Sequence, residues 1–223
     1  MSLFNKATYF RSAHNREDLP PDVGAELAFA GRSNAGKSSA INSITNQNKL
    51  AFVSKTPGRT QQINYFALPN QRYLVDLPGY GYAGVPLELK AHWGDLLSAY
   101  LATRSSLLGL VIMMDSRHPL TELDQRMLAW FSPREKPIRV LLTKFDKLTK
   151  NEAAAALSKV RSSLAAEFPQ ASVQLFSSLN KQGVDDAEDW IATLFGMELR
   201  QRAAAQNKNP RLKGSKVGGK AKP

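Results

Sequence analysis

The stretch ELAFAGRSNAGKSSAINSI, residues 26–44, decides the fold of this chain. An apolar, strand-like run is followed by Gly31, Gly36, Lys37 and Ser38 in the spacing G-x-x-x-x-G-K-[ST], and then by a helical pattern. Glycines at these positions let a loop wrap a phosphate so that several backbone N–H groups converge on it. The lysine reaches the outer phosphates, the serine hydroxyl can bind Mg²⁺, and the helix dipole adds attraction. The stretch therefore predicts a nucleotide-phosphate loop between a buried strand and a helix.

Six short apolar runs look like strands and alternate with helical patterns. They are residues 26–31, 63–68, 72–76, 109–115, 138–143 and 172–176. Four of them are continuously apolar, which is typical of parallel strands buried on both faces. Apolar stripes at the helical period are formed by Leu89, Trp93, Leu96, Leu97 and Tyr100, by Leu157, Val160, Leu164 and Phe168, and by Trp190, Ile191, Leu194 and Phe195.

The order of these elements predicts the fold class. Only Pro69, Asn70 and Gln71 separate the runs 63–68 and 72–76, so we expect these two to pair as a hairpin. We therefore predict an α/β, three-layer P-loop fold. Its sheet should be six-stranded and mostly parallel, with one antiparallel edge strand and helices on both faces.

Length and charge predict one domain with a basic tail. The 223 residues, 43% of them hydrophobic, fit a single domain, which we place at residues 1–199 with a short N-terminal extension over 1–25. Residues 200–223 hold eight of the 30 lysine and arginine residues of the chain and no acidic residue. We expect this tail to be disordered. It could bind a phosphate-bearing partner or serve only solubility.

Composition also excludes some classes of protein. The absence of cysteine rules out disulfides, thiolate catalysis and cysteine-bound metals. The apolar runs are far shorter than the roughly 20 residues of a membrane helix, and the N-terminus lacks the apolar core of a signal peptide. We therefore expect a cytoplasmic protein with no membrane insertion.

A second motif, TKFD, lies at the end of the run 138–143 and points to guanine. The carboxylate of Asp146 can accept hydrogen bonds from guanine N1–H and from its exocyclic amine, whereas adenine offers neither donor on that edge. The aliphatic stem of Lys144 can lie along the plane of the base. Taken alone, these four residues would equally fit a solvated salt bridge at a strand end. Their position after the phosphate loop favours guanine recognition.

Five short motifs together resemble one known family. GRSNAGKSS, TPGRTQ, DLPGYGYA, TKFD and FSS occur in the order of the five G motifs of TRAFAC-class GTPases. The residues within these motifs resemble those of the bacterial EngB family, also called YihA or YsxC. The resemblance covers nearly the whole chain except about the last twenty residues. The resemblance implies a Mg²⁺-dependent GTPase that acts as a switch in assembly of the large ribosomal subunit. It also implies a monomer that is needed for normal cell division and septation.

The resemblance assigns GTP binding to five segments. They are Gly31, Arg32, Ser33, Asn34, Ala35, Gly36, Lys37 and Ser38; Gly58, Arg59, Thr60, Gln61 and Gln62 of switch I; Asp76, Leu77, Pro78 and Gly79 of switch II; Thr143, Lys144, Phe145 and Asp146; and Phe176, Ser177 and Ser178. Ser38 and Thr60 are expected on Mg²⁺, with Asp76 joined to the ion through a water. Thr56 competes with Thr60, but the P-G-x-T wording favours Thr60. The Gly79 N–H is expected to meet the γ-phosphate, and the Ser178 N–H to meet guanine O6.

Two departures from the wider superfamily concern the base-reading loops. Thr143 stands where asparagine is usual, which should remove an amide that ties the base-reading loop to the phosphate loop. Ser178 stands where alanine is usual in the last loop. Both changes favour modest nucleotide affinity and fast exchange.

The group that orients the attacking water is not evident from the sequence. Ras-like GTPases place a glutamine directly after the switch II glycine, but here that position holds Tyr80. Its ring is expected to pack or to contact a partner. Asn34 resembles the asparagine of potassium-stimulated relatives and could help to hold K⁺, although a small polar residue also suits a turn. We therefore expect slow intrinsic hydrolysis that ribosomal particles, and K⁺, accelerate.

Some alternatives stay open. Asp115, Arg117 and His118 could line a partner surface, or form a structural salt bridge. The same phosphate loop would also serve a small kinase, although no acceptor-binding lid is apparent in the sequence. A nucleotide-regulated RNA-binding module with incidental hydrolysis is the third possibility.

Overall fold

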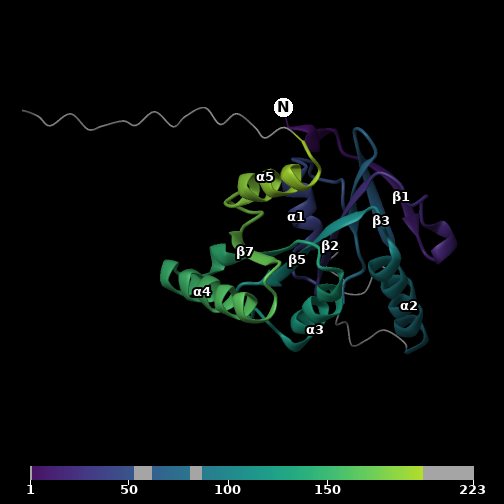
Figure 1. The fold of residues 1–223 in the computed structure, drawn as a ribbon. Coiled ribbons are helices and arrows are strands. Elements are labelled where there is room, and N and C mark those ends of the chain that lie inside the picture. Colours follow the sequence, from purple (N-terminus) through teal and green to yellow (C-terminus); the bar gives the residue numbers. More distant parts are fainter. Residues whose placement is uncertain (1, 53–61, 81–86, 198–223) are drawn as a thin grey trace, which may run out of the picture.

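The computed structural model describes residues 2–52, 62–80 and 87–197, without the side chains of 87–94. These residues form a seven-stranded sheet with the order β1-β3-β4-β2-β5-β6-β7 (Figure 1). The strands are β1 (Thr8–Ala13), β2 (Ala25–Gly31), β3 (Ile63–Leu68), β4 (Arg72–Asp76), β5 (Leu107–Asp115), β6 (Ile138–Thr143) and β7 (Ala171–Phe176). The helices are α1 (Lys37–Ile44), α2 (Leu87–Thr103), α3 (Glu122–Phe131), α4 (Lys150–Glu167) and α5 (Val184–Leu194), with 3₁₀ turns η1 (Leu3–Lys6), η2 (Arg16–Asp18), η3 (Ser132–Arg134) and η4 (Phe145–Lys147).

Strand directions confirm the predicted fold class, with two corrections. Strands β2, β4, β5, β6 and β7 pair in parallel, whereas β3 pairs antiparallel with both β4 and β1. The predicted hairpin of β3 and β4 is present. The predicted count of six strands is one too few for the described residues, and the antiparallel strand is not at the edge, because β1 pairs outside it.

The missed strand β1 has a physical reason for being missed. Its first four residues, from Thr8 to Arg11, are exposed, so its sequence shows no apolar run. An edge strand has only one neighbour and needs no such run. The N-terminal segment that we expected as an extension thus contributes a strand to the sheet, while the expected tail at 200–223 lies outside the described residues.

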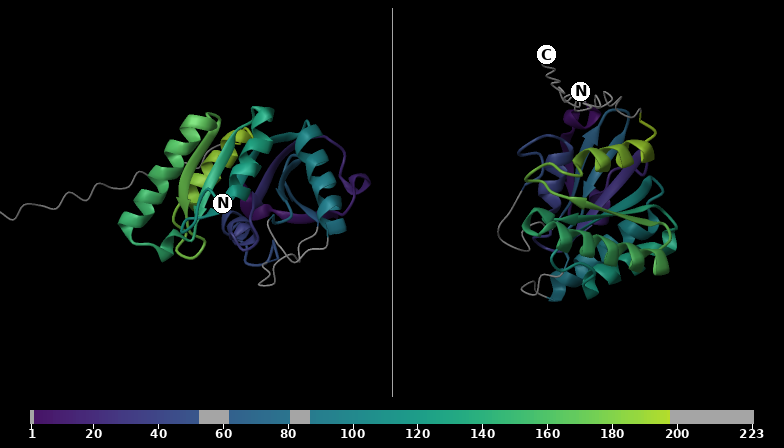
Figure 2. Two further views of the ribbon diagram at one scale, coloured as in Figure 1. Left: turned by 90° about the horizontal axis from the view of Figure 1, so that it is seen from below. Right: turned by 90° about the vertical axis from the view of Figure 1, so that its left-hand side faces the viewer.

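Helices cover both faces of the sheet, as Figure 2 shows from two directions. On β2, Leu27 and Phe29 belong to the core cluster that includes residues of α1 and α5, whereas Ala28 and Ala30 belong to the cluster that includes residues of α2, α3 and α4. Both faces of β2 are therefore buried, which explains its continuous apolar sequence. Within the described ranges, no helix combines the length and the apolar character that crossing a membrane requires.

A buried charge cluster lies at the end of β2 away from the phosphate loop. Glu26 is fully buried, and its carboxylate contacts the guanidinium of Arg104 and accepts a hydrogen bond from the Tyr100 hydroxyl at 2.8 Å. Arg104 also donates to the Pro20 carbonyl oxygen at 2.8 Å, and Asp22 lies 3.6 Å from its guanidinium. These contacts fasten the end of α2 and the segment before β2 to the sheet.

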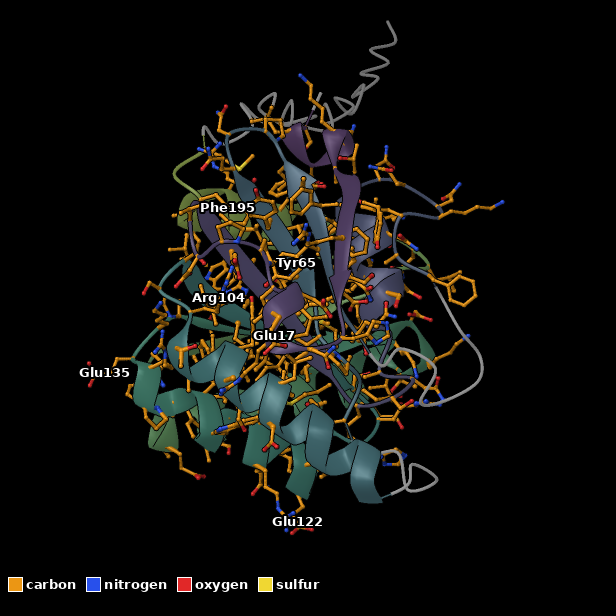
Figure 3. All side chains as sticks on the ribbon, turned by 90° about the vertical axis from the view of Figure 1, so that its right-hand side faces the viewer. Glu17, Tyr65, Arg104, Glu122, Glu135 and Phe195 are labelled. Carbon is orange, nitrogen blue, oxygen red and sulfur yellow. The ribbon has the colours of Figure 1, made fainter. Side chains whose placement is uncertain are left out.

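Aromatic rings extend this cluster across the sheet. The rings of Tyr65 and Tyr100 meet edge to face, with centroids 6.4 Å apart. Burial, reinforced by the Glu26 carboxylate, raises the pKa of the Tyr65 phenol far above its usual value. Figure 3 shows Tyr65 within the outline of the molecule, whereas Glu122 and Glu135 stand at its periphery.

Breaking the buried pair should cost far more than breaking an exposed one. Glu26→Gln should lower the free energy of unfolding by about 3 kcal/mol, because the Arg104 guanidinium would stay buried without its carboxylate. The matched control is Glu122→Gln, which breaks the exposed pair with Arg126 on α3 and should cost less than about 1 kcal/mol. Urea denaturation measures both changes. Equal losses in the two variants would contradict a structural role for the cluster.

Candidate functional site

The predicted phosphate loop lies between the end of β2 at Gly31 and the start of α1 at Lys37. Gly36, the N-cap of α1, has a φ of 94°, a left-handed value that glycine adopts without steric cost. Asn34 also has a positive φ of 64°, a region that asparagine tolerates better than most residues. The segment therefore has the strand–loop–helix form that its glycine spacing predicts, and the N-terminus of α1 faces the loop.

Lys37 and Asp76 bring the first and second phosphate motifs together. Asp76 is the last residue of β4, which lies parallel and next to β2. The Lys37 ammonium contacts the Asp76 carboxylate directly, and both side chains are almost fully buried. Because a buried charge is tolerated only when it is paired, each group requires the other or a substitute. A phosphate can share the ammonium, which has three hydrogens to donate.

The same place offers ligands suited to Mg²⁺. Ser38 follows Lys37 in the first turn of α1, so the Lys37–Asp76 contact joins an element that carries a hydroxyl to one that ends in a carboxylate. Hydroxyl and carboxylate oxygens, completed by phosphate oxygens and water, are the ligands that Mg²⁺ prefers. The residues present thus fit the ion.

The chain beyond β4 runs against the phosphate loop. The Tyr80 N–H donates to the Gly31 carbonyl oxygen at 3.3 Å, and the Tyr80 carbonyl accepts from the Ser33 N–H at 3.0 Å. Gly79 lies close to the same loop, since a Cβ added to it would stand 3.4 Å from Ser33 Cα. The first residues of switch II and the phosphate loop therefore form one hydrogen-bonded unit.

The side chain of Tyr80 points away from this unit, toward α3. Its ring is partly buried against the core, and its hydroxyl donates to Asp124 Oδ1 at 2.9 Å. Burial, and then the Asp124 carboxylate, raises the pKa of this phenol well above its usual value. The hydroxyl is therefore directed to α3 and not to the phosphate loop, which agrees with the expectation that the ring packs.

Thr143 corrects one prediction about the base-reading loop. Its hydroxyl donates to the Ala35 carbonyl oxygen of the phosphate loop at 2.6 Å, with the Met114 carbonyl oxygen 3.2 Å away. The expected loss of the tie between the two loops is therefore wrong, because a hydroxyl at the end of β6 is close enough to replace the amide. The argument for modest affinity and fast exchange loses this support.

Lys144 provides a second tie. It has a φ of 59°, and its ammonium donates to the Asn34 carbonyl oxygen at 2.7 Å and to Asp115 Oδ2 at 3.0 Å. Arg117 binds the same carboxylate at 2.7 Å. The structural salt bridge, one of the two roles considered for Asp115 and Arg117, is therefore present. Burial raises the pKa of Asp115, but the hydrogen bonds from Arg117 and Lys144 outweigh it and hold the pKa well below its usual range.

Ser177 holds the carboxylate that is expected to read guanine. Its fully buried side chain donates to Asp146 Oδ1 at 2.6 Å and accepts from the Leu179 N–H at 3.2 Å. Sequence reasoning placed Ser177 at the base but missed this contact. The available signal was a small hydroxyl residue directly after β7, the strand that pairs with β6.

Some of the remaining predicted residues lie within the described ranges, and others lie outside them. Ala35, Leu77, Pro78 and Phe176 are buried, and Phe145 is partly buried in η4. Ser178 is partly exposed, and Arg32 forms a β-bridge to Tyr80. Thr56, Gly58, Arg59, Thr60 and Gln61 lie outside the described residues. Gln62 contacts the imidazole of His14. Thr60 as a Mg²⁺ ligand and the Ser178 N–H as a base contact stay predictions.

The chain matches a family model over the part that carries most of this geometry. Residues 26–144 match the model described as "50S ribosome-binding GTPase". This range begins in β2 and ends at Lys144. It therefore includes the phosphate loop, Asp76 and the start of the base-reading loop.

Similar proteins extend the likeness to most of the chain. The chain is 59% identical over 199 residues to the "Probable GTP-binding protein EngB" of Methylobacillus flagellatus, covering 89% of this chain and 96% of the relative. It is 54% identical over 193 residues to the protein of the same name from Nitrosomonas europaea, covering 86% and 87%.

Solved structures show the same fold. A crystal structure of a probable GTP-binding protein engB superposes with a TM-score of 0.62 at 21% identity, covering 77% of this chain and 99% of that one. Era in complex with MgGDPNP and nucleotides 1506–1542 of 16S ribosomal RNA gives 0.60 at 18% identity, covering 77% and 56%.

Ser177 should matter for guanine-nucleotide binding although it need not touch the nucleotide. Ser177→Ala should lower affinity for GDP about tenfold, because Asp146 loses its buried anchor. Ser178→Ala is the matched control: it keeps the backbone N–H and should change affinity little. Isothermal titration calorimetry measures both. A Ser177→Ala protein that binds GDP as the unmodified chain does would show that Asp146 needs no anchor.

Proposed function

We propose that this chain, which belongs to the EngB family of GTP-binding proteins, is a GTPase that binds GTP with Mg²⁺ and hydrolyses it to GDP and phosphate. One observation carries the proposal: the base-reading loop is fastened to the phosphate loop by the bonds Thr143–Ala35 and Lys144–Asn34. A ligand with guanine at one end and phosphates at the other fits two loops held together in this way. Asp146 would then read the base while Lys37 pairs with the phosphates.

The residues of the chain would divide the work of phosphoryl transfer to water. The backbone N–H groups of Asn34, Gly36, Lys37 and Ser38, together with the Lys37 ammonium, would hold the phosphates and offset their charge. Ser38 and Thr60 would hold Mg²⁺ directly, with Asp76 acting through a water, and the bound ion would neutralise charge on the phosphate oxygens. The Gly79 N–H would meet the γ-phosphate, so that switch II depends on the nucleotide state.

Intrinsic hydrolysis should be slow for a reason visible in the site. The residue after Gly79 is a tyrosine whose hydroxyl is bonded to Asp124, so it supplies no group to orient the attacking water. A partner would have to supply that group. This reading keeps Tyr80 outside the chemical step.

Base preference separates a GTPase from a small P-loop kinase. The chain should bind GDP far more tightly than ADP, because the partly buried Asp146 carboxylate would face adenine without either donor. Asp146→Asn should weaken GDP binding on the order of a hundredfold, since two hydrogen bonds to a charged group are lost. Calorimetric titration with both nucleotides measures this. Similar affinities for GDP and ADP would contradict the GTPase and favour a kinase.

We propose a precursor of the large ribosomal subunit as the partner, with both RNA and ribosomal protein in contact. The support is the matching family model, described as a 50S ribosome-binding GTPase, together with the eight basic residues in 200–223. We also propose a cytoplasmic location, as expected from composition, and a monomeric state with a role in cell division and septation, as the family resemblance implies. An RNA-binding module with incidental hydrolysis would also bind RNA, but its binding would not depend on GTP.

K⁺ is proposed as an additional activator on the strength of Asn34 alone. Its side chain is exposed at the phosphate loop, where an amide oxygen could help to hold a monovalent ion against the phosphates. Such an ion could offset charge in the transition state. The left-handed backbone of Asn34 gives a second reason for asparagine at this position.

Hydrolysis with purified ribosomal particles tests partner and ion together. We expect a slow rate alone, a faster rate with particles, and a further increase in K⁺ over Na⁺ at equal ionic strength. Deleting residues 200–223 should weaken particle binding and flatten its salt dependence, while GTP affinity stays nearly unchanged. A rate indifferent to particles would favour the RNA-binding module. Equal rates in K⁺ and Na⁺ would contradict the proposed role of K⁺.

A further inference from the structure

Asp124 has a second role besides capping the start of α3. Its Oδ2 atom accepts from the Thr121 N–H at 3.0 Å and from the Thr121 hydroxyl at 2.7 Å, which completes a capping box. Its other oxygen, Oδ1, accepts from the Tyr80 hydroxyl at 2.9 Å. The side chain is only 1% exposed. By contrast, the capping box of α4 uses Glu152, which is exposed. Capping therefore does not require burial, and the contact with Tyr80 needs another explanation.

Tyr80 is held from both ends. Its N–H and carbonyl are bonded to Gly31 and Ser33 of the phosphate loop, while its hydroxyl is bonded to Asp124. The residue thus links the phosphate loop to the first turn of α3. Its neighbour Gly79 carries the N–H that we propose for the γ-phosphate, so any movement of Gly79 toward a third phosphate pulls on Tyr80.

The segment that leads into α3 shows backbone strain. Leu120, directly before the capping residue, has a φ of 58°, which is unusual for a bulky side chain. Its carbonyl oxygen accepts from Gln125 Nε2 at 2.9 Å. Strain of this kind often marks segments that take part in function. The same segment begins at Asp115, which binds Lys144, so residues 115–124 contact both the base-reading loop and switch II.

We propose that the Tyr80–Asp124 hydrogen bond is a latch that keeps residues 79–80 against the phosphate loop and so favours GDP over GTP. The inference rests on the proposed function. In this proposal, drawing the Gly79 N–H onto a γ-phosphate moves the adjoining Tyr80 backbone away from Gly31 and Ser33, and its side chain away from Asp124. Only the triphosphate state loses these hydrogen bonds, so the latch lowers the affinity for GTP and not the affinity for GDP. Tyr80 and Asp124 act as positioning residues.

Three variants separate the latch from the cap. Tyr80→Phe removes only the hydroxyl. Asp124→Asn keeps one oxygen for Thr121 and turns an NH₂ group toward Tyr80, which replaces the charged acceptor by a neutral and weaker partner. Thr121→Val is the matched control, because it breaks the capping box and leaves the acceptor of Tyr80 in place. Affinities for GDP and for a non-hydrolysable GTP analogue are measured with Mg²⁺ by calorimetry. Unfolding by urea without nucleotide is measured for the three single variants and for the double variant Tyr80→Phe/Asp124→Asn.

The latch predicts a distinct set of results. Tyr80→Phe and Asp124→Asn should each raise the ratio of GTP-analogue affinity to GDP affinity by about three- to tenfold, and the double variant should raise it no further. Thr121→Val should lower stability and leave the ratio unchanged. In urea, the double variant should lose less stability than the sum of the single variants.

Two results would overturn the latch. One is an unchanged or lowered affinity ratio in Tyr80→Phe, and the other is strict additivity of the two changes in urea. The unfolding measurement uses no nucleotide and therefore tests the bond on its own. A failure of the proposed function would look different, as equal affinity of the unmodified chain for GDP and ADP.

Discussion

The site depends on the in-register parallel pairing of neighbouring strands. Phe29 pairs with Asp76, Asp115 with Thr143, and Thr143 with Phe176, so the carboxyl ends of five strands meet along one edge of the sheet. Each motif needs only to follow its strand to arrive beside the next. Loops placed in this way are close enough for single hydrogen bonds, such as Thr143 to Ala35 and Ser177 to Asp146, to fasten one to another. A ligand as long as a nucleotide then meets a preorganised surface.

Much of this arrangement follows from sequence because it obeys local rules. Continuous apolar runs identify the parallel strands, since such strands are buried on both faces. Gly36 and Lys37 identify the phosphate loop, since only certain residues allow its backbone and its charge. β1 escaped because an exposed edge strand carries no such signal, and its partner β3 is distant in sequence. α3 was not among the predicted stripes, and its clearest signal is the capping pair of Thr121 and Asp124.

The details of the site that sequence reasoning missed are contacts of side chains with segments that are distant in the sequence. Replacing an asparagine by Thr143 looks like the loss of a tie until the Ala35 carbonyl is seen within reach of the hydroxyl. The bond from Ser177 to Asp146 joins residues 31 positions apart and depends on the register of β6 and β7. Tyr80 is similar, because nothing in its neighbours predicts a buried acid on α3. Such contacts are set by tertiary packing, which leaves no periodic pattern.

The pairing of β1 with β3 has a consequence for how the chain folds during synthesis. The Ser12 hydroxyl donates to Asn64 Oδ1 at 2.6 Å, and these residues are 52 positions apart. β1 is therefore translated well before the strand that must bind it, and it waits as an unpaired edge while β2 and α1 emerge behind it. Thr8 and Arg11 flank its exposed aromatic pair, Tyr9 and Phe10, and so keep the apolar stretch short. A longer apolar strand with a free edge would invite association between nascent chains. The feature that hides β1 from a search for buried strands is thus the one that keeps it soluble until β3 arrives.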